Sequence, residues 1–275
     1  MELVDIEMGM RFLSSQGYTL NVAEVAMLTA SLAKLQADEK FGRIFFWGKI
    51  FGKTQDYYIA YGVRDNDIEF PSKQYYCATG ETFTFGDLAM LTDEEREMIA
   101  TYPQEAAFAG EPDQLLFPKK EDDPEEMEEC PLTELHRLSY TIASMDADTS
   151  VVPATAYVLN DAHQVVPAAE FAGLSWSELK DLNSYAHFRP AKDIGKQRAM
   201  AKDDVEWKNC NFLDRLSSSL PKGCWAVRSD ATVASVQLRS LVWPGYVFYA
   251  VAEKPYFGGV YIGHGIQNRD LPFLL

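Results

Sequence analysis

Residues 43–63 read RIFFWGKIFGKTQDYYIAYGV, and this stretch decides the predicted fold. Two runs rich in aromatic and β-branched residues, 43–51 and 56–63, flank a short polar connection, which is typical of a β-hairpin. The first run is apolar on both predicted faces, with Phe45, Trp47 and Phe51 on one and Ile44, Phe46 and Ile50 on the other. A strand of this kind is central and covered, or lies at an interface. Gly48 within the run predicts a bulge or a close backbone approach.

Two helices are predicted before this hairpin. Leu3, Ile6, Met10 and Leu13 follow the spacing of one apolar stripe on a helix. The second helix is expected to begin after Asn21, because Asn21 and Glu24 are placed to form a capping box. Its buried face would carry Val25, Leu28, Leu32 and Leu35.

The rest of the chain alternates between expected strands and helices. Capping-box pairs, Thr92 with Glu95 and Ser175 with Glu178, predict helices at 92–103 and 175–185, and an apolar pattern predicts a third helix at 204–220. Further strands are expected at 75–85, 151–159, 234–239, 247–251 and 259–262, with a turn at Trp243-Pro244-Gly245. The absence of βαβ alternation predicts an α+β fold, in which N-terminal helices precede a mainly antiparallel sheet with interspersed helices and a C-terminal β-meander.

The segment 111–150 differs from its surroundings in composition. It contains twelve acidic and three basic residues, and the run EDDPEEMEE at 121–129 is nearly all carboxylate. Because such a run repels itself, we expect a flexible, solvated loop at about 111–132 within a single domain spanning 1–275. An alternative is a docking segment for a basic partner.

Composition and charge exclude several classes of function. The net charge of −16 disfavours binding to nucleic acid or to an anionic membrane, and it suits a basic protein partner. Cys77, Cys130, Cys210 and Cys224 are widely separated, which predicts reduced thiols in a cytosolic compartment. The acidic start of the chain does not resemble a signal peptide, and no apolar run is long enough for a membrane span. A soluble, intracellular protein is expected.

No catalytic, metal-binding or cofactor-binding signature is present in the sequence. The four histidines, His136, His163, His187 and His264, do not show metal-ligand spacing. The two clusters Gly258-Gly259 and Gly263-His264-Gly265 are not followed by a helix-forming segment, so they are interpreted as turns and not as a phosphate loop. Excess aromatic residues are typical of interfaces. The candidates for partner contact are Trp47, Tyr57, Trp243, Tyr246 and Tyr261.

A set of short segments, in order along the chain, resembles the family of radial spoke head protein 9, from the axonemes of motile cilia and flagella. The segments are FWGKI at 46–50, DYYIA at 56–60, GLS at 173–175, LNSYAHFR at 182–189, PKGCW at 221–225, LRSLVWPG at 238–245, YIGHG at 261–265 and DLPF at 270–273. The resemblance covers nearly the whole chain except about 82–145.

This resemblance implies a structural subunit of the radial spoke head without enzymatic activity, located in the cytoplasm and cytoskeleton at the ciliary axoneme. The implied partners are the related head proteins 4 and 6 and MORN-repeat head proteins, in a head that faces the central-pair apparatus. Such a head relays mechanical signals between the central pair and the dynein arms. A rigid load-bearing surface, and not a cleft, is therefore expected.

Three alternatives follow from the same sequence. The chain could be a relative of the longer head proteins 4 and 6, which its length disfavours, or an adaptor unrelated to cilia. It could also be a cytosolic enzyme with a dispersed Cys/His site. That last alternative would be favoured if His187 and Cys224 lined one buried polar cleft.

Overall fold

A single eight-stranded sheet organises the molecule. The computed structural model describes residues 1–14, 17, 19–64, 69–80, 82–117, 131–200 and 212–274. The strand order is β4-β3-β2-β1-β12-β11-β10-β9. The strands are β1 (Arg43–Ile50), β2 (Tyr57–Val63), β3 (Lys73–Thr79), β4 (Gly86–Asp87), β9 (Trp225–Asp230), β10 (Ser235–Ser240), β11 (Tyr246–Val251) and β12 (Phe257–Gly263).

The sheet consists of two antiparallel halves, one from each end of the chain. β1 to β4 form the first half and β9 to β12 form the second, which is the predicted C-terminal meander. The halves join where β1 runs parallel to β12, with Gly48 opposite Tyr261. The fold is therefore α+β with a mainly antiparallel sheet, as predicted, and β1 is central.

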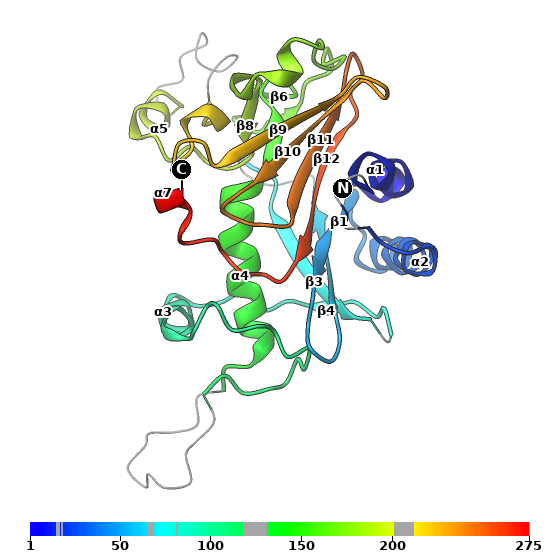
Figure 1. Cartoon of the computed structure of the whole chain (residues 1–275), viewed down its shortest axis with the longest axis vertical. Helices are drawn as coiled ribbons and strands as arrows, with labels where there is room; N and C mark the ends of the chain where they lie inside the picture. Colours follow the sequence, from blue (N-terminus) through cyan, green and yellow to red (C-terminus); the bar gives the residue numbers. More distant parts are fainter. Residues whose placement is uncertain are drawn as a thin grey trace, which may run out of the picture.

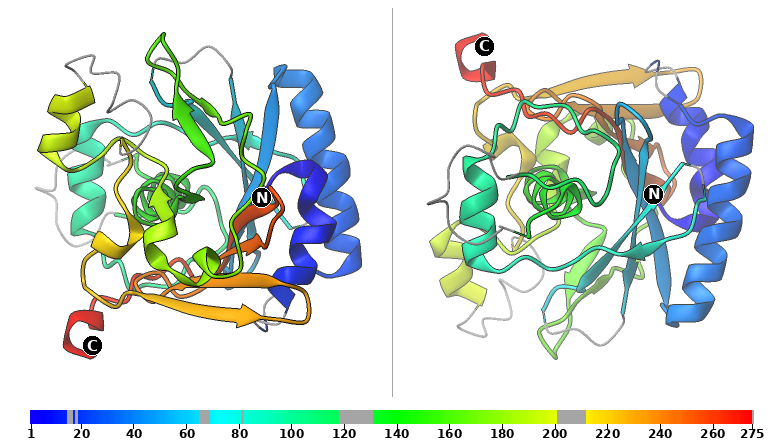
Figure 2. Two further views of the ribbon diagram at one scale, coloured as in Figure 1. Left: turned by 90° about the horizontal axis from the view of Figure 1, so that it is seen from above. Right: turned by 90° about the horizontal axis from the view of Figure 1, so that it is seen from below.

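Helices cover both faces of the sheet (Figures 1 and 2). On one face, α1 (Ile6–Leu13) and α2 (Val22–Glu39) enclose a core that includes Ile6, Leu28 and Phe46. On the other face, α4 (Glu134–Thr149) packs over a second core. The remaining helical segments are η1 (Leu3–Asp5), α3 (Asp93–Thr101), η3 (Glu178–Lys180), η4 (Leu182–Ser184), α5 (Ile194–Met200), η5 (Leu216–Ser218) and α7 (Leu271–Leu274).

The start of α2 is fixed by the predicted capping box. The Glu24 amide donates to Asn21 Oδ1 at 2.8 Å, and the Asn21 amide donates to Glu24 Oε2 at 2.7 Å. Glu24 also joins the helix to the sheet, because its Oε1 lies 2.8 Å from Lys49 Nζ on β1 and accepts from the Tyr58 hydroxyl at 2.6 Å. Burial alone would raise the pKa of Glu24, but these hydrogen bonds lower it.

Gly48 marks a β-bulge, as predicted. The register between β1 and β2 shifts between Phe46 and Gly48. A Cβ atom at Gly48 would lie 2.2 Å from the Tyr261 carbonyl oxygen, so the glycine also permits close approach of β12. The extra residue changes the alternation: Ile50 packs on the α4 side with Trp47, and not with Ile44 and Phe46 as predicted.

Several predicted elements differ from the structure. The expected helix at 175–185 is wrong: the segment forms the short turns η3 and η4, although the Ser175–Glu178 contacts of the capping box are present. The expected strand at 151–159 is divided into β5 (Val151–Pro153) and β6 (Tyr157–Leu159), which pair with β8 (Tyr185–His187) and β7 (Val165–Pro167). The expected strand at 75–85 ends at Thr79 in β3.

Two other predictions fall partly outside the described residues. Of the expected helix at 204–220, only 212–220 is described, and its helical part is η5. The acidic run at 121–129 lies outside the described residues, so a flexible loop there stays a prediction.

Helix α3 begins after Thr92 with the predicted capping box and ends before Pro103. Helix α4 was not predicted.

Candidate functional site

The five aromatic residues predicted to contact a partner lie together in the core between the sheet and α4. Each side chain is at most 8% exposed, and all five belong to one hydrophobic cluster. The ring centroids of Trp47 and Tyr261 are 5.7 Å apart, and Trp243 Nε1 donates to Asp148 Oδ2 at 3.1 Å. These side chains therefore contribute to the core of this chain. Their contact with a partner stays a prediction.

Glu134, at the start of α4, is a buried carboxylate that sequence reasoning missed. Its side chain accepts hydrogen bonds from the Tyr57 hydroxyl at 2.6 Å and from the amides of Ala109 and Gly110 at 2.6 and 2.7 Å. The Glu111 amide lies at 3.2 Å. A buried carboxylate is stable only when it is hydrogen-bonded in this way. Glu134 thus ties the 108–111 segment, β2 and α4 into one body.

Arg137, one turn further along α4, extends this buried cluster. It is 1% exposed, and its guanidinium lies 4.3 Å from the centre of the Phe108 ring and 5.1 Å from that of Tyr102. The side chain also donates to the Ala106 carbonyl. Cation–π contacts of this kind strengthen when they are desolvated. The cluster therefore makes the end of the molecule around α3 and α4 rigid.

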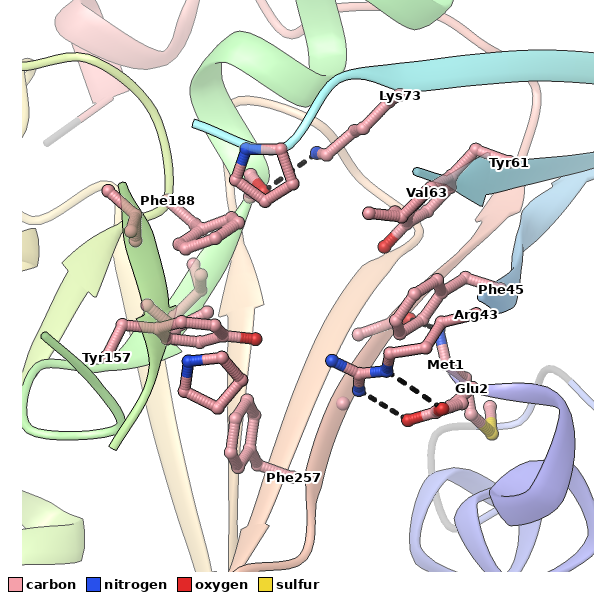
Figure 3. Close-up of a pocket in the computed structure, with 18 of the residues that line it drawn as sticks. Met1, Glu2, Arg43, Phe45, Tyr61, Val63, Lys73, Tyr157, Phe188 and Phe257 are labelled. Carbon is pink, nitrogen blue, oxygen red and sulfur yellow. Dashed lines mark hydrogen bonds and ion pairs between the residues drawn. The ribbon is translucent and has the colours of Figure 1, made fainter. Parts of the chain in front are cut away.

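A cleft of about 320 Å³ opens on the α4 side of the sheet (Figure 3). Phe45 and Tyr61 of the sheet lie on one side of the cleft, stacked with their ring centroids 4.9 Å apart. Tyr157 and Phe188 lie on the opposite side, with centroids 4.4 Å apart. Phe257 of β12 also lines it. The aromatic rings on both walls could hold an apolar side chain of a partner.

Two ion pairs line this cleft. Arg43 binds Glu2 with a 2.5 Å contact, and Lys73 Nζ lies 2.5 Å from Asp146 Oδ2. The Arg43–Glu2 pair also positions the start of the chain, where the Met1 nitrogen donates to the carbonyl oxygen of Phe46 at 2.9 Å. Because their partners are in place, these four side chains are not arranged to bind a charged ligand.

A second hollow contains the two residues that the enzyme alternative requires. His187 and Cys224 both line it, together with Ser219, Asp148 and several basic residues. His187 Nε2 lies 2.8 Å from Ser219 Oγ, whereas His187 Nδ1 has no hydrogen-bond partner among the described residues. The two hollows do not test the expectation of a rigid load-bearing surface, which stays a prediction.

Burial in this second hollow acts against nucleophilic chemistry. It lowers the pKa of His187 to about 4, which makes the imidazole a weak base. It also raises the pKa of the Cys224 thiol, which disfavours the thiolate that would be the nucleophile. The pair of Ser219 and His187 lacks an orienting carboxylate on Nδ1 within the part of the chain that is described. The hollow brings the predicted residues together without activating them.

Within the described ranges, no group of three or more His, Cys, Asp or Glu side chains is placed to hold a metal ion. The helices of those ranges likewise include none with the length and apolar character of a membrane span. Cys77 and Cys224 are both buried free thiols, as predicted, and burial raises the pKa of Cys77 to about 12.

Comparison with known proteins connects the fold to a family. Residues 1–131 match the family described as radial spokehead-like protein. The chain is 31% identical over 271 residues to a radial spoke head protein 9 homolog of Danio rerio, covering 95% of each chain. It is 31% and 30% identical over 283 residues to the homologs of Bos taurus and Homo sapiens, covering each chain completely. The similarity therefore includes both halves of the sheet, and this chain belongs to the radial spokehead-like protein family.

Proposed function

We propose that this chain is a structural, non-catalytic subunit of the radial spoke head in the axoneme of cilia or flagella. The observation that carries the proposal is similarity along the whole chain to radial spoke head protein 9 homologs, at 30–31% identity. This similarity also supports the short type over a relative of the longer head proteins 4 and 6. In this role the protein helps to assemble the head and relays mechanical signals between the central pair and the dynein arms.

The architecture suits a load-bearing part. One sheet connects the two ends of the chain through the β1–β12 pair, and helices brace both of its faces. The buried Glu134 cluster and the link from Glu24 to Lys49 fasten helices to strands by hydrogen bonds as well as by packing. Buried hydrogen-bond networks of this kind help to make a structure rigid. The proposed partners are head proteins of the 4 and 6 type and MORN-repeat head proteins.

The location can be tested by labelling the chain in a ciliated cell. A compact electron-dense tag fused to the C-terminus should appear in tomograms at the spoke head, facing the central pair. Purified spokes should contain the tagged chain together with the other head subunits. A tag found only in the cell body, or on the central pair itself, would refute the proposal.

The hollow around His187 and Cys224 is the one observation that favours the enzyme alternative. We expect the purified chain to hydrolyse ester, peptide and phosphoester substrates no faster than buffer does, because burial suppresses both the base and the thiolate. Ser219→Ala and Cys224→Ser provide matched controls. Turnover that disappears in either variant would establish an enzyme and overturn the structural assignment.

A further inference from the structure

The hollow around His187 is positively charged, although the chain as a whole is acidic. It has a volume of about 990 Å³, which is room for several residues of a peptide. Among the described residues, five basic and three acidic side chains line it, whereas the whole chain carries a net charge of −16. The basic residues are Arg189, Lys192, Lys196, Arg215 and Arg269, and the acidic residues are Asp148, Asp193 and Asp214.

Two of the three carboxylates are already held by neighbours in the chain. Asp214 serves two cations, since its Oδ2 lies 3.2 Å from Arg189 Nη1 and its Oδ1 lies 3.5 Å from Lys196 Nζ. Asp193 Oδ1 accepts from the amides of Gly195 and Lys196, at 2.7 and 3.3 Å. One carboxylate shared by two cations leaves an excess of positive charge in this part of the hollow.

Three exposed cations of the described chain are available at the hollow. Lys192 is 68% exposed, and its Nζ lies 3.7 Å from Asp148 Oδ1, an exposed contact of the kind that contributes little. Arg269 is exposed and forms no ion pair with a described residue. Lys222 has no carboxylate partner in the described ranges, and its Nζ donates to the carbonyl oxygen of Ser217, which lines the hollow. These three side chains can bind a negatively charged group from outside.

Apolar side chains line much of the remaining hollow. Leu220 is 80% exposed although it is a large aliphatic residue, and Trp225 and Val242 line the hollow beside it. Exposed apolar surface bordered by polar groups is typical of a site of protein contact. A ligand that carries an apolar side chain next to its carboxylates therefore matches the hollow in both respects.

His187 adds a polar atom without a partner to the wall of the hollow. The residue is 5% exposed, its Nε2 lies 2.8 Å from Ser219 Oγ, and its Nδ1 has no hydrogen-bond partner among the described residues. Buried polar atoms in folded proteins are nearly always hydrogen-bonded. An acceptor oxygen brought by a ligand would supply the missing bond, directly or through a water molecule, when Nδ1 carries the proton.

We propose that this hollow binds a short acidic segment of a partner protein, in which carboxylates flank an apolar side chain. The carboxylates contact Lys192, Arg269 and Lys222, and the apolar side chain packs on Leu220. This binding depends on the hollow alone and not on the spoke-head role, so it can be tested on the purified chain.

The extent of the positive charge favours a short peptide over a nucleic acid strand. Charges are screened over about 8 Å at physiological ionic strength, so only groups within the hollow are attracted by its basic side chains. A nucleic acid strand carries phosphates well beyond this distance, where it would meet the acidic remainder of the chain. Inorganic phosphate, in turn, would leave the apolar lining without a contact.

Binding can be measured by fluorescence anisotropy, with the full chain titrated into a short labelled peptide of glutamates around one central leucine. We expect saturable binding that weakens as the salt concentration rises. The double variant Lys192→Glu, Arg269→Glu should weaken binding by at least about tenfold, because two attractive charges become repulsive. The matched control is Lys34→Glu with Lys53→Glu, which changes two exposed lysines outside the hollow and should alter the affinity by less than about twofold.

Further measurements separate the ligand classes and exclude unfolding. A peptide with serine in place of the leucine should bind more weakly, because it loses its apolar contact with Leu220. Neither inorganic phosphate nor a polyuridine RNA strand should displace the labelled peptide. Both double variants should keep the thermal midpoint of the wild type, since all four side chains are exposed. A wild-type chain that does not bind the peptide, equal weakening by the two double variants, equal binding of the serine peptide, or displacement by phosphate or RNA would each overturn the proposal.

Discussion

At the scale of single residues, buried polar groups hold the molecule together. Glu134 is 3% exposed and receives hydrogen bonds from two segments distant in sequence, β2 and residues 108–111. The sequence did not indicate this role, because an acidic residue after Thr133 is what any helix N-terminus favours. Its partners on β2 and in the 108–111 segment are identified only when the chain is folded.

Replacing Glu134 by alanine should destabilise the fold strongly. The change leaves the Ala109 and Gly110 amides and the Tyr57 hydroxyl buried without their acceptor, and each such group costs about 1–3 kcal/mol. We expect a loss of roughly 3–5 kcal/mol in the free energy of unfolding, measured by urea denaturation. Glu97→Ala, an exposed acid on α3, is the control and should change this free energy by less than about 0.5 kcal/mol. Equal effects of the two changes would contradict the structural role of Glu134.

His187 should make stability fall as the pH falls. Burial lowers the pKa of His187 to about 4 in the folded chain from its ordinary value of 6.5, so the unfolded chain binds the proton first. The contribution of the neutral His187 to the free energy of unfolding is fully present above its ordinary pKa. It is lost as the pH falls toward the pKa of His187 in the folded chain. It amounts to about 2 kcal/mol between about pH 7.5 and about pH 5.

Comparison of the wild-type chain with His187→Gln isolates this contribution, because the carboxylates are common to both. Between the higher and the lower pH, the free energy of unfolding should fall further for the wild type than for the variant. A variant with the same pH dependence as the wild type would show that His187 titrates normally.

At the scale of elements, local patterns predicted strands better than helices. The both-face apolar pattern of 43–51 correctly placed β1 at the centre of the sheet, since a covered strand needs apolar residues on both sides. The position of Ile50 was mispredicted because the bulge at Gly48 reverses the alternation after it. A glycine in the sequence indicates a possible bulge but not the direction in which the next side chain points.

Helix α4 was not predicted, because it lies within a segment of acidic composition and its apolar stripe was not recognised there. Leu138, Ile142 and Met145 are spaced four and three residues apart and are buried. The reverse error occurred at 175–185, where a helix start signal is followed by a new cap: Asp181 accepts from the Asn183 amide and starts η4. With two short turns in place of one helix, Leu179 and Tyr185 are both buried in the core. Tertiary packing favours this arrangement, and helix propensity does not predict it.

Gly48→Ala should disrupt the junction between the two halves of the sheet. The new methyl group would lie 2.2 Å from the Tyr261 carbonyl oxygen, and backbone on both sides leaves it no room to move. We expect a loss of about 2–3 kcal/mol in the free energy of unfolding. Gly86→Ala in β4 is the matched control, because nothing lies within 4 Å of its added Cβ. A Gly48 variant as stable as this control would contradict the close approach of β1 and β12.

At the scale of the whole molecule, the sheet depends on a contact that no local pattern specifies. The parallel β1–β12 pair joins residues more than two hundred positions apart, and its strands could be predicted individually but not their pairing. The same limit applies to the site: the five aromatic candidates for partner contact are buried in the core of this chain, and an abundance of aromatic residues does not reveal which side of a strand faces solvent. The aromatic cleft and the hollow at His187 are likewise products of tertiary packing.

The family assignment rests on order and coverage along the chain and not on any single site. The relatives that match over the complete length are radial spoke head protein 9 homologs. We propose on this basis that the chain is a structural part of the spoke head.

Cryo-electron tomography of axonemes from ciliated cells that lack the gene is the decisive test of this role. We expect spokes with missing or incomplete head density, and normal heads after re-expression of the wild-type chain or of a Ser219→Ala, Cys224→Ser double variant, since neither hydroxyl nor thiol is needed for a structural role. Complete heads in the absence of the chain, or rescue by the wild type but not by a folded double variant, would show that the chain is not a purely structural head subunit.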